Sequence, residues 1–330
     1  MTKGGKKRLL TGYRPTGRMH LGHYEGNLKN MLEAQTKYDC FFFIADWHAL
    51  TTKYKDVSRL KDDTREMVID WLAAGLDPAK CHIYRQSDLP EIAEFHLYLS
   101  MITPLGWLER NTTYKDQLRE LGARLVATYG FLGYPVLQAA DILIMKAALV
   151  PVGEDQLPHL ELAREIARRF NFYYGACLTE PEAMLSAAPK VIGLDGRKMS
   201  KSYDNAVYLS DEPDVIKKKI KMMVTDPARA RANDPGHPEV CSVFSTYAIF
   251  APDETKEIAK SCRAGRIGCT DCKERLADKV AETLEPLREK RHRFMNEPGL
   301  VEGVLADGLR TAKAEADLTL TEVRKKLNIQ

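Results

Sequence analysis

The sequence predicts an α/β protein in which a parallel sheet wrapped by helices is followed by a helical half. In the first half of the 330-residue chain, short apolar runs alternate with amphipathic stretches, a pattern typical of parallel sheets covered by helices. After residue 205 the sequence becomes nearly all helix-forming. Because single cores rarely grow beyond about 250–300 residues, we expect two domains, residues 1–205 and 206–330.

The predicted strands are apolar runs of strand length. Four runs qualify: residues 9–12, 40–45, 82–84 and 149–152. Helical spacing of apolar residues marks three segments of the first half: residues 21–32, 60–72 and 156–170. Residues 91–148 form a mostly helical insertion that prolines are expected to interrupt at 104–106 and 134–135. The elements together predict a Rossmann-like doubly wound parallel sheet with a helical insertion. In the second half, we expect Pro286 to kink a long helix.

Composition restricts the class of protein only loosely. The 49 basic and 46 acidic residues give a formal charge of +3, which neither requires nor excludes a polyanionic partner. The basic N-terminus has no long apolar stretch behind it, and no run reaches membrane length. We therefore expect a cytoplasmic protein with no membrane contact. Cys40, Cys81 and Cys177 lie among apolar or aromatic neighbours, as reduced core thiols do.

Two short segments, far apart in the chain, favour chemistry on ATP. His20–His23 follows a glycine-marked turn between the first strand and helix, where imidazoles and helix N-terminal donors can bind phosphate. Lys198–Ser202 offers two lysines and two hydroxyls on a loop after Gly196 that can close over a leaving group. Either segment alone is typical of a solvated surface. Together they mark four catalytic candidates: His20, His23, Lys198 and Lys201.

A single carboxylate, Asp141, interrupts the apolar helical stretch 134–143. Burying an unpaired carboxylate costs several kcal/mol, so we expect Asp141 to have a polar partner. The two alanines before it leave space for a large ring.

With their flanks, residues 14–17 and 194–197, the two segments resemble the signatures of class I aminoacyl-tRNA synthetases. That resemblance implies a second set of residues around ATP. These are Arg14, Pro15, Thr16, Gly22, His23, Gly153, Glu154, Asp155, Val191, Lys198, Met199, Ser200, Lys201 and Ser202. Gly153 and Asp155 are implied for the ribose, with Mg²⁺ on the phosphates. Asp155 alone could equally be a helix cap.

The resemblance extends from about residue 10 to 298 and is to the tryptophanyl-tRNA synthetase family. Tyrosine enzymes of this class carry, in the first strand, a tyrosine that recognises the substrate phenol; Leu10 stands there in this chain. An apolar Leu10 suits an indole. The implied tryptophan site comprises Leu10, His48, Gln138, Asp141 and Gln156. Arg14 departs from the glutamine of many bacterial members.

Four cysteines form a separate cluster in the helical half: Cys241, Cys262, Cys269 and Cys272. Four thiolates hold either zinc or an iron–sulfur cluster, and spacing alone does not choose between them. Some bacterial tryptophanyl-tRNA synthetases carry a [4Fe-4S] cluster with a similar pattern near an α-helical anticodon-binding region. The resemblance therefore implies that cluster, with zinc as the alternative and Cys241 as the least secure ligand.

The resemblance implies an enzyme that activates L-tryptophan with ATP and charges tRNA(Trp), acting as a homodimer. Two other interpretations stay open at this point. One is the tyrosine-specific enzyme, and the other is an inactive paralogue that serves as an RNA-binding module.

Overall fold

The computed structural model describes residues 5–121, 128–185 and 191–329, without the side chains of residues 117, 120, 121 and 202. Its described strands form one parallel sheet in the order β3-β2-β1-β4-β5. They are β1 (Arg8–Tyr13), β2 (Asp39–Ile44), β3 (Cys81–Arg85), β4 (Leu149–Val152) and β5 (Glu182–Leu185). The chain therefore builds outward from β1 to β3 and then crosses to β4, which places a topological switch point between β1 and β4.

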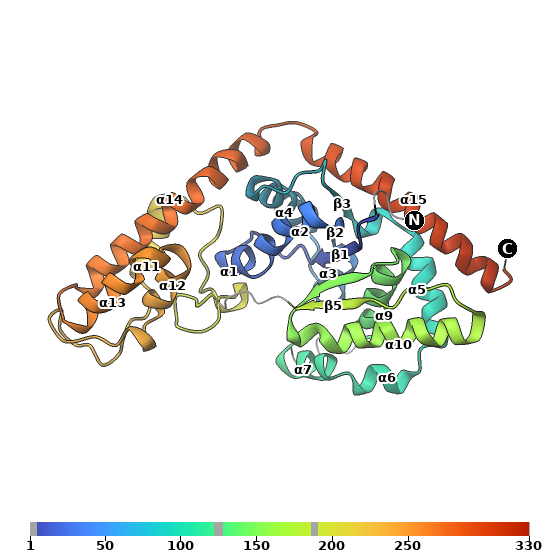
Figure 1. The fold of residues 1–330 in the computed structure, drawn as a ribbon, viewed down its shortest axis with the longest axis horizontal. Coiled ribbons are helices and arrows are strands. Elements are labelled where there is room, and N and C mark those ends of the chain that lie inside the picture. The colour runs from blue at the N-terminus through green and yellow to red at the C-terminus, as the bar shows by residue number, and fades with distance from the viewer. Residues whose placement is uncertain (1–4, 122–127, 186–190, 330) are drawn as a thin grey trace.

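Helices cover both faces of the sheet (Figure 1). The first half contains α1 (Leu21–His23), the π-helix η2 (Tyr24–Leu28), α2 (Lys29–Lys37), α3 (Asp46–Lys53), α4 (Leu60–Ala74), α5 (Glu91–Ile102), α6 (Leu105–Arg110), α7 (Thr112–Leu121), α9 (Tyr129–Ile144) and α10 (Leu157–Tyr174). The second half contains α11 (Pro213–Lys221), α12 (Ser242–Phe250), α13 (Thr255–Arg263), α14 (Cys269–Met295) and α15 (Leu300–Lys326). None of the helices in the described ranges is long and apolar enough to span a membrane.

Alternation along each strand divides the core into two layers. On β1, Leu9 belongs to the layer that α2 and α4 cover, whereas Leu10 belongs to the layer that α5, α9 and α10 cover. The first layer continues without a break into the helical half, where it includes Tyr247 of α12 and Leu276 of α14. The two halves of the chain therefore share one hydrophobic core.

The four predicted strands are confirmed, with ends that shift by at most one residue. The fifth strand, β5, carries no buried run, since Leu185 is 58% exposed, and its sequence gave no strand signal. The expected interruption at residues 134–135 is wrong, because α9 runs through Pro135. Phe131, Pro135 and Val136 are all buried, so packing compensates for the hydrogen bond that proline cannot donate. Helix α14 is likewise continuous through Pro286.

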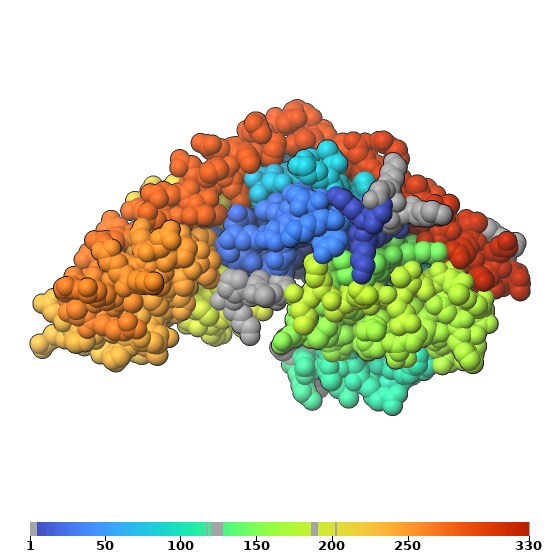
Figure 2. All heavy atoms as spheres, viewed as in Figure 1, coloured from blue at the N-terminus to red at the C-terminus, as the bar shows by residue number. Residues whose placement is uncertain are grey.

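The last helix, α15, returns to the α/β half and lies along β3 and α5. Figures 1 and 2 show it leaving the helical half and crossing over the sheet side of the molecule. A Cβ on Gly308 would lie 1.9 Å from the carbonyl oxygen of Ile83, so only glycine permits this approach. Residues 300–326 therefore pack with the predicted first domain rather than with the rest of 206–330.

Candidate active site

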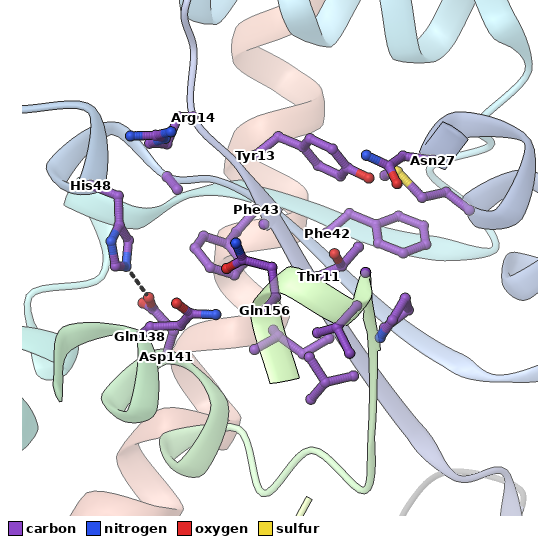
Figure 3. Close-up of a pocket in the computed structure, with 18 of the residues that line it drawn as sticks. Thr11, Tyr13, Arg14, Asn27, Phe42, Phe43, His48, Gln138, Asp141 and Gln156 are labelled. Atoms are coloured by element: carbon purple, nitrogen blue, oxygen red, sulfur yellow. Dashed lines mark hydrogen bonds and ion pairs between the residues drawn. The ribbon is translucent and has the colours of Figure 1, made fainter. Parts of the chain in front are cut away.

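A cavity of about 560 Å³ opens at the carboxyl ends of β1 and β4, where the strand order reverses (Figure 3). Ligands of open α/β sheets bind at this point, and the volume is that of a small-molecule site. Eleven of the predicted site residues line it: Leu10, Arg14, Thr16, His23, His48, Gln138, Asp141, Gly153, Asp155, Gln156 and Lys198. The topology thus brings both predicted ligand sites into one cavity.

The two histidines of the first segment stack on each other at the start of α1. Their ring centroids are 3.7 Å apart, and the backbone N–H of His20 donates to His23 Nδ1 at 3.3 Å. Burial lowers the pKa of His20 to about 4, helped by Lys201 and Lys198. Burial lowers the pKa of His23 to about 2, with further contributions from His20 and the two lysines. At neutral pH both rings are uncharged hydrogen-bond donors rather than cations.

Gly22 of the first segment faces the second segment. A Cβ there would lie 3.0 Å from two atoms of the His20 ring and 3.7 Å from Cβ of Met199. The glycine therefore makes room for the His20 imidazole and for the second segment.

The second segment is tied back on itself by a short backbone hairpin. Met199 N–H donates to the Val191 carbonyl at 2.9 Å, and Gly193 N–H donates to the Arg197 carbonyl at 2.7 Å. The Asn205 side chain accepts from Ser200 N–H at 2.8 Å. Val191 and Met199 are buried, so they anchor the loop and do not line the cavity.

Lys201 connects the second segment to the first. Its Nζ donates to the Gly17 carbonyl at 2.8 Å and lies 3.4 Å from Thr16 Oγ1. Burial lowers the pKa of Lys201 to about 8, against an opposing contribution from Asp63. The ammonium therefore contacts the turn before the histidines, next to Thr16, which lines the cavity together with Lys198.

Asp141 has the partners that its burial requires, as predicted. Its side chain has no exposed surface, and Oδ2 lies 2.9 Å from His48 Nε2 (Figure 3). Gln86 Nε2 lies 2.9 Å from both oxygens. Burial raises the pKa of Asp141. Hydrogen bonds from His48 and Gln86, together with the charge of His48, oppose the rise. The carboxylate is thus fixed at the wall of the cavity with Leu10 nearby on β1.

Comparisons with known proteins assign this constellation to a family. The family model described as tRNA synthetases class I (W and Y) matches residues 2–285. This chain belongs to that class I synthetase family. Tryptophan–tRNA ligases of Thermotoga maritima and Aquifex aeolicus are 47% and 44% identical to it, each over 98% of this chain and over 99% and 100% of the relative.

A solved structure agrees with the sequence relatives. The tryptophanyl-tRNA synthetase of Campylobacter jejuni, complexed with ADP and tryptophan, superimposes with a TM-score of 0.90 at 36% identity. The match covers 97% of this chain and 99% of that one. The predicted Rossmann-like sheet followed by a helical region is therefore confirmed for this synthetase.

Not every predicted residue of the synthetase lines the cavity. Glu154 is exposed, and Pro15 is buried outside the cavity. Asp155 and Gln156 bond to each other, with Gln156 Nε2 2.9 Å from Asp155 Oδ2. The side chain of Ser202 lies outside the part that the structure describes.

Sequence reasoning missed several polar residues of the synthetase cavity. Tyr134 lines it and pairs with His159 Nε2 at 2.6 Å; burial lowers the pKa of His159 to about 4. Tyr13 and Asn27 lie beside each other at the opposite end (Figure 3), and burial raises the pKa of Tyr13. Tyr13 directly follows the predicted first strand, so its position at the strand end was an available signal.

The four clustered cysteines converge from three helices of the synthetase. Cys241 precedes α12, Cys262 ends α13, and Cys269 and Cys272 begin α14; all four line one small cavity. Arg229 Nη1 lies 3.8 Å from the sulfurs of both Cys262 and Cys269. Burial raises the pKa of Cys272 to about 12, helped by the other three thiols.

The four cysteines line one cavity, but their side chains are not arranged to bind a metal ion as they stand. Among the residues that the structure describes, no three or more His, Cys, Asp or Glu side chains are placed to hold a metal ion as they stand. The seven cysteines are all free of disulfides. The convergence of four thiols nevertheless provides the donor chemistry that a thiolate-bound metal centre needs.

Proposed function

We infer that this chain is a tryptophan–tRNA ligase, which activates L-tryptophan with ATP and transfers it to tRNA(Trp). Relatives that carry this name are 40–47% identical over nearly the whole chain. The observation in this molecule that carries the assignment is the cavity itself. It joins a fixed carboxylate, Asp141, and an apolar Leu10 to the two phosphate-binding segments.

In the first step, a carboxylate oxygen of tryptophan attacks the α-phosphorus of ATP, and the bond from that phosphorus to the bridging oxygen breaks. Tryptophanyl-adenylate forms, and pyrophosphate leaves with the bonding electrons. We propose that neutral His20 and His23 donate to the phosphates while Lys198 and Lys201 neutralise the departing pyrophosphate. Preorganised donors of this kind stabilise charge where it develops, and Mg²⁺ bound to the phosphates would add to that neutralisation.

Recognition of the amino acid is proposed for the other end of the cavity. Asp141, oriented by His48 and Gln86, would accept the indole N–H, with Gln138 beside it. Leu10 offers no polar group to a phenol oxygen, which favours tryptophan over tyrosine. Gln156 is proposed for the substrate side, and Gly153 and Asp155 for the ribose.

We propose that Cys241, Cys262, Cys269 and Cys272 hold a [4Fe-4S] cluster, with zinc as the alternative. Four thiols around one cavity suit either centre, and the raised pKa of Cys272 means that a bound cation is needed to stabilise the thiolates. Anaerobically purified protein should absorb broadly near 400 nm and contain iron; one zinc per chain without iron would support the alternative.

The remaining assignments concern partners. We propose that the helical half binds the tRNA anticodon region and that two chains form a homodimer in the cytoplasm. Leu97, Met101 and Leu105 are more than half exposed on α5 and α6, and an apolar surface of this kind supports association.

The test of the assignment is transfer of radiolabelled amino acid to tRNA. Purified enzyme with ATP, Mg²⁺ and bulk bacterial tRNA should charge tryptophan into an acid-precipitable product, and periodate-oxidised tRNA should give none. Charging by tyrosine alone would identify the tyrosine-specific enzyme. Binding of tRNA without charging by either amino acid would identify a retired paralogue.

A further inference from the structure

A buried ion pair connects the two halves of the chain. Arg291 of α14 donates through Nε to Asp70 Oδ1 of α4 at 2.8 Å. Asp70 has no exposed surface, and Arg291 is 7% exposed. The guanidinium also pairs with Glu66, one turn earlier on α4, and lies 2.8 Å from the sulfur of Met295. Figure 1 shows this end of α14 beside α4.

The second oxygen of Asp70 binds the backbone directly before the His20–His23 segment. Oδ2 accepts the backbone N–H of Met19 at 3.1 Å, and Met19 is the residue directly before His20. The Met19 carbonyl accepts from Leu209 N–H at 2.9 Å. The peptide groups on both sides of Met19 are therefore held, one by α4 and one by the segment that follows Lys198–Ser202.

Arg291 holds the Asp70 carboxylate in the orientation in which its other oxygen accepts the Met19 N–H. Burial raises the pKa of Asp70 to about 7, while the Met19 N–H and, at longer range, Lys201 and Arg18 oppose the rise. A buried carboxylate whose cationic partner is removed is strongly disfavoured and takes up a proton. The carboxyl would then carry a hydroxyl on one oxygen, which is a poor acceptor, and without Arg291 nothing would fix which of its two oxygens faces the Met19 N–H.

We propose that Arg291 is a positioning residue for adenylate formation, which acts from the helical half through Asp70 and the Met19 N–H to hold His20 and His23 toward the phosphates. The proposal rests on the assigned role of the two histidines in the ligase reaction. It means that displacement of α14 relative to α4 changes the position of the histidines. The Asp70–Arg291 pair thus connects the helical half to the first chemical step.

The alternative is that the Asp70–Arg291 pair only fastens two helices together. The two roles predict different rates of adenylate formation in protein that is fully folded. If the pair is only structural, loss of Arg291 lowers the melting temperature. If Arg291 is a positioning residue, its loss lowers the rate of adenylate formation in fully folded protein and leaves tryptophan binding unchanged.

The experiment uses single-turnover formation of tryptophanyl-adenylate by the full-length enzyme, well below its melting temperature. Arg291→Met is compared with Arg293→Met, which changes an exposed arginine of the same helix. We expect Arg291→Met to slow adenylate formation about 10- to 100-fold, since displacement of catalytic groups by about 1 Å costs up to that much. Arg293→Met should retain the unaltered rate, and the Kd for tryptophan should stay within about twofold in both.

Asp70→Asn provides the rescue. Its amide oxygen can still accept the Met19 N–H, but it carries no charge that needs Arg291. The double variant Asp70→Asn, Arg291→Met should therefore be at least several-fold faster than Arg291→Met alone. A double variant as slow as Arg291→Met, or an Arg291→Met that melts earlier but keeps its rate, would overturn the proposal.

Two further comparisons keep the test decisive. If Arg291→Met does not fold, Arg291→Lys replaces it; its shorter, non-planar donor should give a slower rate than the unaltered enzyme, and an unchanged rate counts against positioning. Failure of the ligase assignment itself is separate, because then the unaltered enzyme would form no adenylate with tryptophan.

Discussion

The cavity at the sheet and the cavity between the four cysteines differ in how far their side chains are already positioned to bind a ligand. Each brings together residues that lie far apart in the chain. In the first, stacked His20 and His23 are neutral donors, and Lys201 is already seated on the Gly17 carbonyl. In the second, four thiols surround a space beside Arg229, and burial raises the pKa of two of them, Cys262 and Cys272. The proposed ATP site is therefore organised without its ligand, whereas the proposed cysteine site would need a cation to stabilise its thiolates.

The largest expected effect tests the prepared site. Lys201→Ala should slow ATP–pyrophosphate exchange about 100- to 1000-fold, the usual loss when one preorganised donor to a developing charge is removed. Equilibrium binding of tryptophan should change little, because Lys201 lies toward the phosphates. Lys37→Ala, on the exposed end of α2, is the control. Equal losses in exchange and tryptophan affinity would contradict the role given to Lys201.

A smaller loss is expected at the amino-acid end of the same cavity. Asp141→Asn keeps the shape but removes the charge from an indole hydrogen bond, which is worth roughly 1.5–3 kcal/mol. We expect kcat/KM for tryptophan to fall about 10- to 100-fold, with KM for ATP unchanged. Steady-state exchange at varied tryptophan concentration measures this, and an unchanged kcat/KM would remove Asp141 from the recognition site.

The pH dependence sharpens the claim that Lys201 acts as a cation. Because its pKa in the free enzyme is lowered to about 8, the ammonium is present below that pH and is lost as the pH rises through it. The value of kcat/KM for ATP reports the free enzyme and should fall about tenfold per unit above pH 8. In Lys201→Arg the cation persists, so the fall should disappear; the same fall in both enzymes would assign it to another group.

The smallest expected effect concerns the cysteine site. Cys272→Ser should abolish the iron absorbance and lower the melting temperature, yet change tryptophan-dependent pyrophosphate exchange by less than about threefold, because α14 begins far from the sheet cavity. Cys177→Ser, a half-buried thiol outside the cluster, should change none of the three. A collapse of exchange in folded Cys272→Ser protein would mean that the two sites are coupled.

The sequence was sufficient for features that depend on short-range pattern. The buried runs of β1 to β4 could be identified from their apolar residues. The two candidate phosphate-binding segments could be located because each follows a glycine and carries several polar residues, and their role stays a prediction. Burial alone predicted that Asp141 has a polar partner. It could not identify Gln86 as that partner, because Gln86 lies 55 residues away in the sequence. β5 was not predicted, because an edge strand with exposed side chains has no hydrophobic signal.

Other features depend on tertiary contacts that no local pattern encodes. The persistence of α9 through Pro135 reflects packing on both sides of the helix. The return of α15 to β3 needs the close approach at Gly308, a residue that looks unfavourable in an isolated helix. The Asp70–Arg291 pair joins residues 221 positions apart, and each of them reads as an ordinary charged residue of an amphipathic helix.

The most direct measurement is ATP–pyrophosphate exchange by the unaltered enzyme with each amino acid in turn. The account predicts that tryptophan supports exchange in the presence of Mg²⁺, without tRNA, and that tyrosine at the same concentration gives no more than the background without amino acid. Exchange stimulated by tyrosine alone, or by neither amino acid in fully folded protein, would contradict it.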